Sequence, residues 1–280
     1  MPGSPPPYRP KADLIARGVK GPSPLGTSTF IGLRALDPLL QYSILAHGLG
    51  TGFLARLGIS TIPLSAAVVT RTGFRIIDRL GLPLERLILL GMAVGSAAKQ
   101  IFWLTYISQE EFQPKPAAII SAFNSLFNTA NSLLLLTTAT SAALSTRPLT
   151  VHVPGTRATS VSLPVAVGTV LYVLGILLET GSELQRKSFK DDPEHRGKLC
   201  RSGLWGWARH VNYAGHTLWR GGYALAAGGW VAGTATVAFH VHNFIGNGIV
   251  SLDYYMSRRY KDQWGRYKED VKWKLVPGIY

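Results

Sequence analysis

Four polar positions recur at helical spacing along one short stretch of the chain. They are Arg209, Asn212 or Tyr213, His216 and Arg220. Because the steps are three or four residues, these side chains would form one stripe on a helix. The stripe enters an apolar segment, where polar and ionisable groups are costly and usually serve a function. Arg also binds phosphate through two parallel N–H bonds, a geometry that Lys cannot match. The pattern therefore predicts a site for a polar, anionic ligand at a membrane surface.

Arg220 needs a partner, because it lies inside an apolar run where an unpaired charge is expensive. A carboxylate or a ligand phosphate would serve. Glu179 and Glu183 end another apolar run, and since they are four residues apart they share a helix face, which Lys187 extends. Three interpretations stay open. The carboxylates pair with Arg220, they mark the point where a helix leaves the membrane, or they accept hydrogen bonds from the ribose or amide of a cofactor.

The composition is that of a polytopic membrane protein. The 280 residues are 46% hydrophobic and 16% charged, whereas a soluble domain carries about 25% charged residues. The formal net charge is +14, but the Lys and Arg residues lie between apolar runs, where the positive-inside rule accounts for them. We therefore expect membrane lipids as partners, and no nucleic acid.

The apolar runs predict an all-α, polytopic transmembrane helical bundle of about six spans, with five or seven as alternatives. A Pro-rich segment, residues 1–28, precedes them and is typical of a disordered tail. The expected spans lie within residues 38–70 (one or two spans), 87–107 (interrupted only by Lys99), 116–146, 161–178 and 213–250. The last range is long enough for two short helices joined by a turn near Gly228 to Gly233. Residues 151–161 fit either a short hairpin or a plain loop.

Charge and amide patterns indicate how these spans are oriented. Three Asn side chains at helical spacing should face other helices rather than lipid: Asn124, Asn128 and Asn131. The basic segments 183–201 and 251–280 should lie together on the cytosolic side, because a helical hairpin separates them. The basic segment 71–86 should be cytosolic too. Simple alternation of the spans cannot satisfy all three segments, so one apolar run is re-entrant or the span count is wrong.

The sequence offers little for disulfide or metal chemistry. Cys200 is the single cysteine, so no intrachain disulfide or cysteine-based metal site can form. The seven His residues are mostly scattered, and His240 and His242, two apart, do not share a helix face. Metal sites of membrane oxygenases require many clustered ligands, so we expect no metal.

Three motifs in the C-terminal part resemble a known family. Residues 203–216 read GLWGWARHVNYAGH, residues 179–189 read ETGSELQRKSF, and residues 264–280 read WGRYKEDVKWKLVPGIY. They are similar to the G-L-W-x-x-x-R-H-P-N-Y-x-G-E signature, the acidic-x-Q-K-x-x-F element and the W-x-x-Y … V-x-W … P-x-I-Y close of the steroid 5-alpha-reductase C-terminal domain. Sterol double-bond reductases and a group of uncharacterised membrane proteins share this domain.

The resemblance implies a membrane reductase that acts on a lipid substrate in the endoplasmic reticulum. NADPH would bind from the cytosolic side, and hydride would pass to a carbon–carbon double bond of a steroid, sterol or other enone-type lipid. The resemblance divides the chain into N-terminal transmembrane helices, 29–160, and a C-terminal domain, 161–280, with a cytosolic loop and tail. Together with the stripe, it predicts these cofactor-binding residues: Glu179, Glu183, Arg186, Lys187, Arg209, His210, Asn212, Tyr213, His216, Arg220, Asp253 and Tyr267.

The chain departs from the signature at two positions. Val211 stands where the family has Pro, and His216 stands where it has Glu. A His cannot reproduce the acceptor role of a carboxylate. Two other functions stay open. One is a methyltransferase resembling the isoprenylcysteine carboxyl methyltransferases, which share an R-H-P-x-Y-x-G motif and use S-adenosylmethionine. The other is a non-catalytic membrane relative. Asn212 and the aromatic tail favour the reductase.

Overall fold

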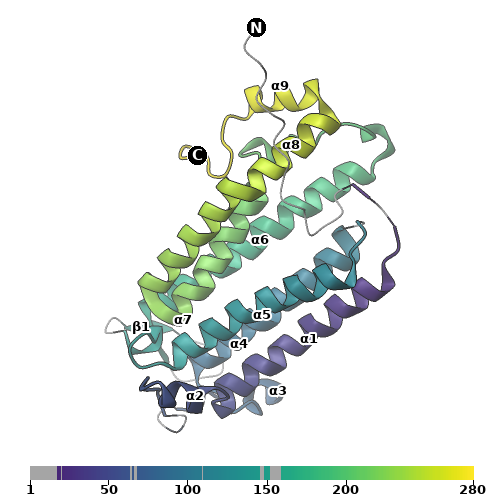
Figure 1. Ribbon diagram of the computed structural model, residues 1–280. Helices are drawn as coiled ribbons and strands as arrows, with labels where there is room; N and C mark the ends of the chain where they lie inside the picture. The colour runs from purple at the N-terminus through teal and green to yellow at the C-terminus, as the bar shows by residue number, and fades with distance from the viewer. Residues whose placement is uncertain are drawn as a thin grey trace.

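Long helices lie side by side in the computed structural model (Figure 1), which describes residues 18–280 except 20, 64, 66–67, 109, 146–147 and 152–158. The α-helices of the described part are α1 (Pro24–His47), α2 (Thr51–Arg56), α3 (Arg75–Asp78), α4 (Leu84–Phe102), α5 (Pro114–Leu136), α6 (Leu163–Asp191), α7 (Val211–Asn243), α8 (Ile249–Tyr260) and α9 (Asp262–Asp270). Shorter helical turns are η2 (Trp103–Ile107), η3 (Ala142–Leu144), η4 (Pro193–His195), η5 (Gly203–Gly206) and η6 (Phe244–Gly248). Two strands, β1 (Pro148–Val151) and β2 (Thr159–Ser162), pair antiparallel, and the residues between them lie outside the described part.

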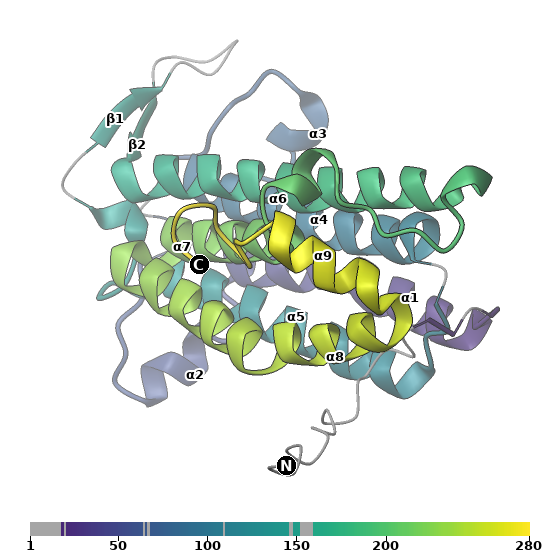
Figure 2. The same ribbon diagram turned by 90° about the horizontal axis from the view of Figure 1, so that it is seen from above.

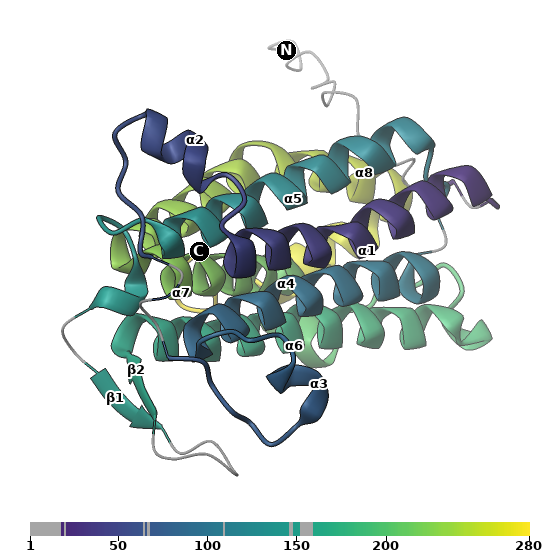
Figure 3. The same ribbon diagram turned by 90° about the horizontal axis from the view of Figure 1, so that it is seen from below.

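The fold class expected from the sequence is confirmed. Among the described residues, four helical segments are long and apolar enough to cross a membrane, by length and composition: Leu84–Ile107, Pro114–Leu136, Leu163–Asp191 and Val211–Tyr260. α6 packs along α7, while α1 packs against α4 and α5; Figures 2 and 3 show these two groups from opposite sides. The protein is an integral membrane protein built as an all-α bundle.

The turn expected near Gly228 to Gly233 is present inside α7. Gly228 and Gly229 leave the helical region, and Gly229 has φ +70°, a left-handed conformation that a residue without Cβ adopts readily. The chain folds back there, so α7 consists of a first limb before Gly228 and a second limb that continues through η6 into α8. Counting these limbs separately, six long helical limbs form the described bundle.

The two basic segments expected to lie together do so. Leu199 packs with Trp264 and Tyr267, and Arg201 pairs with Asp270 at 3.0 Å. We call this end of the bundle the α9 end (top of Figure 1). The segment 71–86 lies at the opposite end, near α2 and α3 (Figure 1). The expectation that it shares a side with 183–201 is therefore wrong. Because the three basic segments need not all lie on one side, simple alternation of the spans no longer conflicts with their placement.

The start of the bundle also differs from the prediction. α1 begins at Pro24, inside the segment 1–28 assigned to a tail and well before the span expected from residue 38. Pro suits the first turn of a helix, where its missing N–H is not needed. The described part of residues 57–70 contains no long helix. The sequence reasoning stopped at Arg34 and Asp37 because charges break an apolar run.

Those two charges are buried together. Arg34 and Asp37 form an ion pair at 3.3 Å, and Nδ2 of Asn128 donates to Asp37 at 2.6 Å. The three Asn residues of α5 are buried as expected, at 5%, 0% and 5% exposure for Asn124, Asn128 and Asn131. Pairing and hydrogen bonding thus remove most of the cost of placing α1 inside the bundle.

Candidate active site

Small residues let α6 and α7 approach closely, and this approach builds the site. A Cβ atom added at Gly215 would lie 2.5 Å from the backbone nitrogen of Glu179, and one added at Gly222 would lie 2.5 Å from the backbone nitrogen of Tyr172. Small residues at membrane helix interfaces permit such backbone contact. Gly215 ends the run RHVNYAG, so its position brings Glu179 against the polar stripe of α7.

Three side chains surround the carboxylate of Glu179. Lys99 of α4 forms an ion pair with Oε1, and Nε1 of Trp219 donates to Oε2 at 2.6 Å. Nδ1 of His216 lies 3.4 Å from Oε1. A carboxylate oxygen accepts, so His216 is the donor through Nδ1, and Nε2 of the neutral ring keeps a lone pair.

Arg220 is buried and has no carboxylate partner among the residues that the structure describes. It is 2% exposed, and its Nη2 donates to Oδ1 of Asn124 on α5. Its guanidinium lies 4.3 Å from the ring centroid of Trp219 and 5.5 Å from that of Phe127, and such cation–π contacts offset part of the cost of burial. Nε and Nη1 find no hydrogen-bond partner among the described residues. The pairing with a carboxylate of α6, which the sequence left open, does not occur.

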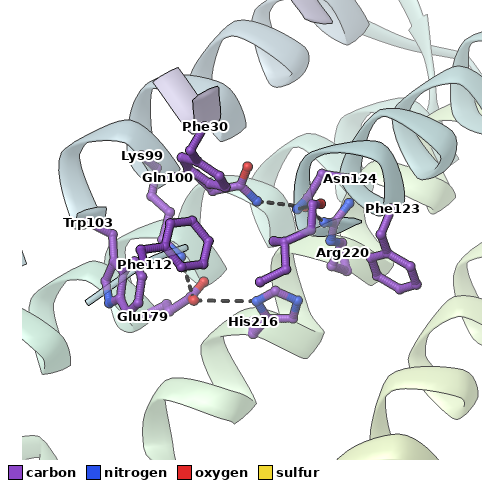
Figure 4. A pocket seen from close by; sticks show the side chains of 11 residues that line it. Phe30, Lys99, Gln100, Trp103, Phe112, Phe123, Asn124, Glu179, His216 and Arg220 are labelled. Carbon is purple, nitrogen blue, oxygen red and sulfur yellow. Dashed lines mark hydrogen bonds and ion pairs between the residues drawn. The ribbon is translucent and has the colours of Figure 1, made fainter. Parts of the chain in front are cut away.

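A cavity of about 270 Å³ lies at this point between the helices (Figure 4). Its polar lining consists of Lys99, Gln100, Asn124, Glu179, His216 and Arg220. Its aromatic lining consists of Phe30, Trp103, Phe112 and Phe123, with Ile120 beside them. Nε2 of Gln100 donates to Asn124 at 2.7 Å, while its Oε1 is buried without a partner in the described part of the chain. Apolar walls with a few convergent polar groups are characteristic of a ligand site.

A second group of the predicted residues lies nearer the α9 end of the same two helices. Glu183 is 4% exposed; it accepts a hydrogen bond from Nδ2 of Asn212 at 2.7 Å and pairs with Arg186. Lys187 pairs instead with Asp191 at 2.5 Å. Oδ1 of Asn212 is buried and has no partner within the described residues. Glu183 and Glu179 share one face of α6, so this group adjoins the cavity along the helix.

Arg209 and His210 lie at the start of α7 and contact the C-terminal segment. The Arg209 guanidinium donates to backbone carbonyls there, including that of Lys272 at 3.2 Å. These hydrogen bonds fix the C-terminal segment against the start of α7. His210 is 1% exposed, and burial, together with the charge of Arg209, lowers its pKa to about 4. The ring of Tyr213 lies between those of His210 and Phe244, with centroid distances of 5.5 Å and 4.3 Å.

Asp253 and Tyr267 serve the same docking of the tail. Asp253 accepts a hydrogen bond from Nε1 of Trp264 at 2.7 Å. The hydroxyl of Tyr267 donates to the backbone oxygen of Trp205 at 2.6 Å, and burial raises the pKa of that hydroxyl. The structure therefore brings the predicted residues together as two adjoining groups. Glu179, His216 and Arg220 line the cavity, and the others lie toward the α9 end.

Sequence reasoning assigned no residue of the N-terminal helices to the site. Lys99 was visible as the single charge in an apolar run, which is a signal of function, but nothing in the sequence linked it to Glu179. Gln100 carried no separate signal. Among the described residues, no cluster of three or more His, Cys, Asp or Glu side chains is placed to hold a metal ion.

Comparison with known proteins gives two kinds of relative. The chain is 36% identical over 247 residues to a probable O-methyltransferase, ustE, of Ustilaginoidea virens. The aligned region covers 88% of this chain and 84% of that protein. A delta(14)-sterol reductase of Neurospora crassa is 30% identical over 161 residues, or 41% of this chain and 33% of the reductase. The delta(14)-sterol reductase ERG24B of Gibberella zeae is 28% identical over 162 residues, or 41% of this chain and 34% of the reductase. The chain thus spans about a third of the length of these two sterol reductases.

A family profile covers the C-terminal part of the chain, which contributes part of the site. The profile of the family described as "Protein of unknown function (DUF1295)" matches residues 120–271, which include most of α5 and all of α6 and α7. This integral membrane protein belongs to the DUF1295 family and is similar over part of its length to sterol reductases.

Proposed function

We propose that this protein is an NADPH-dependent reductase of a carbon–carbon double bond in a hydrophobic, enone-type acceptor such as a steroid, a sterol or another lipid. The observation that carries the proposal is the cavity, in which Arg220 presents two buried nitrogens without partners among the described residues. Hydride addition to an enone drives negative charge onto the carbonyl oxygen, and preorganised donors in a water-poor site stabilise such charge strongly. The partial similarity to sterol reductases supports the same activity.

The residues toward the α9 end fit the polar parts of NADPH. Oδ1 of Asn212 and Nδ1 of His210 are buried without partners in the described structure, and each can bond to an amide or a ribose hydroxyl. Glu183 offers carboxylate oxygens beside them, and the half-exposed Arg186 suits a phosphate. NADPH, when bound, supplies the hydride.

The two parts of the chain contribute differently to this scheme. The expected cofactor residues all come from the C-terminal domain, 161–280. The N-terminal helices, 29–160, supply Lys99, Gln100 and the aromatic lining. We therefore assign cofactor binding to the C-terminal domain and acceptor binding to the N-terminal helices. In this scheme Trp103 and Phe112 keep water from the reacting carbon, as hydride transfer requires.

We place the α9 end on the cytosolic side of the endoplasmic reticulum membrane. The segments 183–201 and 251–280 carry six and seven Lys or Arg residues and lie at that end. The segment 71–86, at the opposite end, carries four. The larger positive charge favours the cytosol for the α9 end, and NADPH is then taken up from the cytosol while the lipid acceptor enters from the bilayer.

Turnover by detergent-purified protein tests the proposal. NADPH consumption is followed with a panel of conjugated enone lipids and, for each, the matched saturated ketone. We expect consumption with an enone only, and a decrease of about a hundredfold or more in kcat for Arg220→Gln, the scale seen when one oxyanion donor is removed. Arg258→Gln, which removes an exposed guanidinium of α8, should leave turnover unchanged. No consumption with any enone, together with no binding of NADPH, would overturn the proposal.

A second candidate, O-methyl transfer, is favoured by one specific observation. The relative that covers 88% of this chain is named a probable O-methyltransferase. In that case S-adenosylmethionine would replace NADPH, and a neutral His216 would take the proton from the acceptor hydroxyl. Incubation of the purified protein with radiolabelled S-adenosylmethionine and phenolic or acidic lipids distinguishes the two activities. Binding of neither cofactor would indicate a non-catalytic relative.

A further inference from the structure

The polar lining of the cavity carries more positive than negative charge. Lys99 and Arg220 are cations, and Glu179 is the single carboxylate of the lining. Lys99 is matched by its ion pair with Glu179. No carboxylate of the described residues lies within ion-pair distance of Arg220, which is 2% exposed. A buried cation without a counter-charge is strongly unfavourable, so a ligand that leaves a negative charge beside Arg220 would bind best here.

His216 faces this unbalanced charge and can accept a proton. The groups around it are Lys99 from α4, Glu179 from α6, Arg220 one turn along its own limb, and His240 from the second limb of α7. The two cations disfavour a positive imidazole, and Glu179 favours one. Since Nδ1 of His216 donates to Glu179, Nε2 remains as the proton acceptor.

His240, next to His216, has the same hydrogen-bonding arrangement, in which Nδ1 donates and Nε2 can accept. Its Nδ1 lies 2.9 Å from the carbonyl oxygen of Thr236, which can only accept, so the proton of the neutral ring is on Nδ1. Its Nε2 is buried and unpartnered within the described part of the chain. The two imidazole centroids are 5.4 Å apart. The cavity therefore places one cation without a counter-charge near Nε2 of His216, which can accept a proton, and the ring of His240 lies next to His216 outside the cavity lining.

We propose that this cavity is an oxyanion site, which binds planar, apolar molecules through an ionised oxygen, as phenolates or enolates. On binding, the ligand O–H bond breaks and an N–H bond forms at Nε2 of His216. The oxygen keeps the electron pair and accepts hydrogen bonds from Nε and Nη1 of Arg220. The aromatic lining packs against the planar body. This ligand class deepens the proposed function, on which it rests, because the enolate left by hydride addition to an enone carries the same charge at the same oxygen.

A chromogenic phenol tests the proposal without any cofactor. 4-Nitrophenol absorbs visible light only when ionised, so its protonation state on the purified protein can be read directly during a pH titration. We expect binding to lower the pKa of the probe by at least one unit, which corresponds to about a tenfold preference for phenolate over phenol. Arg220→Gln should abolish this shift, and Arg258→Gln should retain it. The same detergent without protein supplies the baseline.

A matched pair of ligands keeps the test decisive if Arg220→Gln fails to fold. 4-Nitroanisole has nearly the same body as 4-nitrophenol but cannot ionise. On the wild-type protein at a pH below the pKa of the free phenol, 4-nitrophenol should raise the apparent Tm more than 4-nitroanisole, because only the phenol can pass a proton to His216 and leave an anion beside Arg220. The difference should shrink as the pH rises above that pKa, since the imidazole must then take its proton from water. Equal stabilisation by the two probes, or none by either, would overturn the oxyanion site. Failure of NADPH turnover with phenolate binding intact would instead refute only the proposed reductase activity.

Discussion

Replacement of Gly215 by Ala should separate α6 from α7 and dismantle the cavity lining. The added Cβ would lie 2.5 Å from the backbone nitrogen and 2.9 Å from the Cα atom of Glu179. Backbone atoms cannot rotate away, so the helices must move apart by about 1 Å to restore ordinary contact. Such a movement would stretch the hydrogen bond between Trp219 and Glu179 from 2.6 Å to beyond its normal range. Overpacking of this kind costs about 1–3 kcal/mol, with the loss of buried hydrogen bonds in addition.

Thermal unfolding in one detergent and binding of 4-nitrophenolate measure the two consequences. Gly215→Ala should lower the apparent Tm by several degrees and weaken phenolate binding at least tenfold. Gly91→Ala is the matched control, because Gly91 lies in α4 with nothing within 4 Å of an added Cβ. It should be neutral or slightly stabilising, since Ala favours helix. Wild-type stability and binding in Gly215→Ala would refute the claim that close helix approach builds the site.

Three further predictions follow from the same contacts. Asn212→Ala removes the 2.7 Å hydrogen bond to Glu183 and should lower the free energy of unfolding by about 1 kcal/mol. It should also remove most of the NADPH-induced thermal shift. Unchanged NADPH affinity would exclude Asn212 from the site. His216→Glu places a carboxylate four residues from Arg220 on one helix face, so the preference for phenolate should disappear; an unchanged spectral shift would show that Arg220 is not the anion partner. The pKa of His210 is about 4 in the folded protein against an ordinary 6.5, so the unfolded state binds more protons between these two pH values. The free energy of unfolding should therefore fall as the pH drops from 6.5 to 4, by about 3 kcal/mol over the whole range. His210→Gln should flatten that dependence, and a slope equal to that of the wild type would contradict the assignment.

The elements that were predicted well are those governed by local sequence. The hairpin of α7 follows from adjacent glycines in an apolar run, because Gly229 can take a left-handed conformation. The Asn stripe of α5 follows from helical spacing, because amides avoid lipid. The proximity of Glu179 and His216 could be predicted only in part from the sequence. A family signature placed both near a cofactor, but their contact depends on Gly215 and on the packing of two distant segments.

The elements that were missed depend on contacts between distant segments. α1 was shortened because Arg34 and Asp37 appear as charges in the sequence but are an ion pair in the bundle. Lys99 could not be assigned because its partner, Glu179, lies on another helix. The hydrogen bonds from Arg209 to the C-terminal segment could not be predicted either, because their acceptors are backbone carbonyls, which every sequence contains.

The most direct test of the central claim is the thermal stability of the detergent-purified protein with NADPH or S-adenosylmethionine. A ligand that binds only the folded state stabilises it by about 2.7 kcal/mol at a hundredfold excess over its Kd. We expect NADPH to raise the apparent Tm and S-adenosylmethionine to leave it unchanged. Stabilisation by S-adenosylmethionine alone would contradict the reductase proposal and identify the cavity as the acceptor site of a methyltransferase.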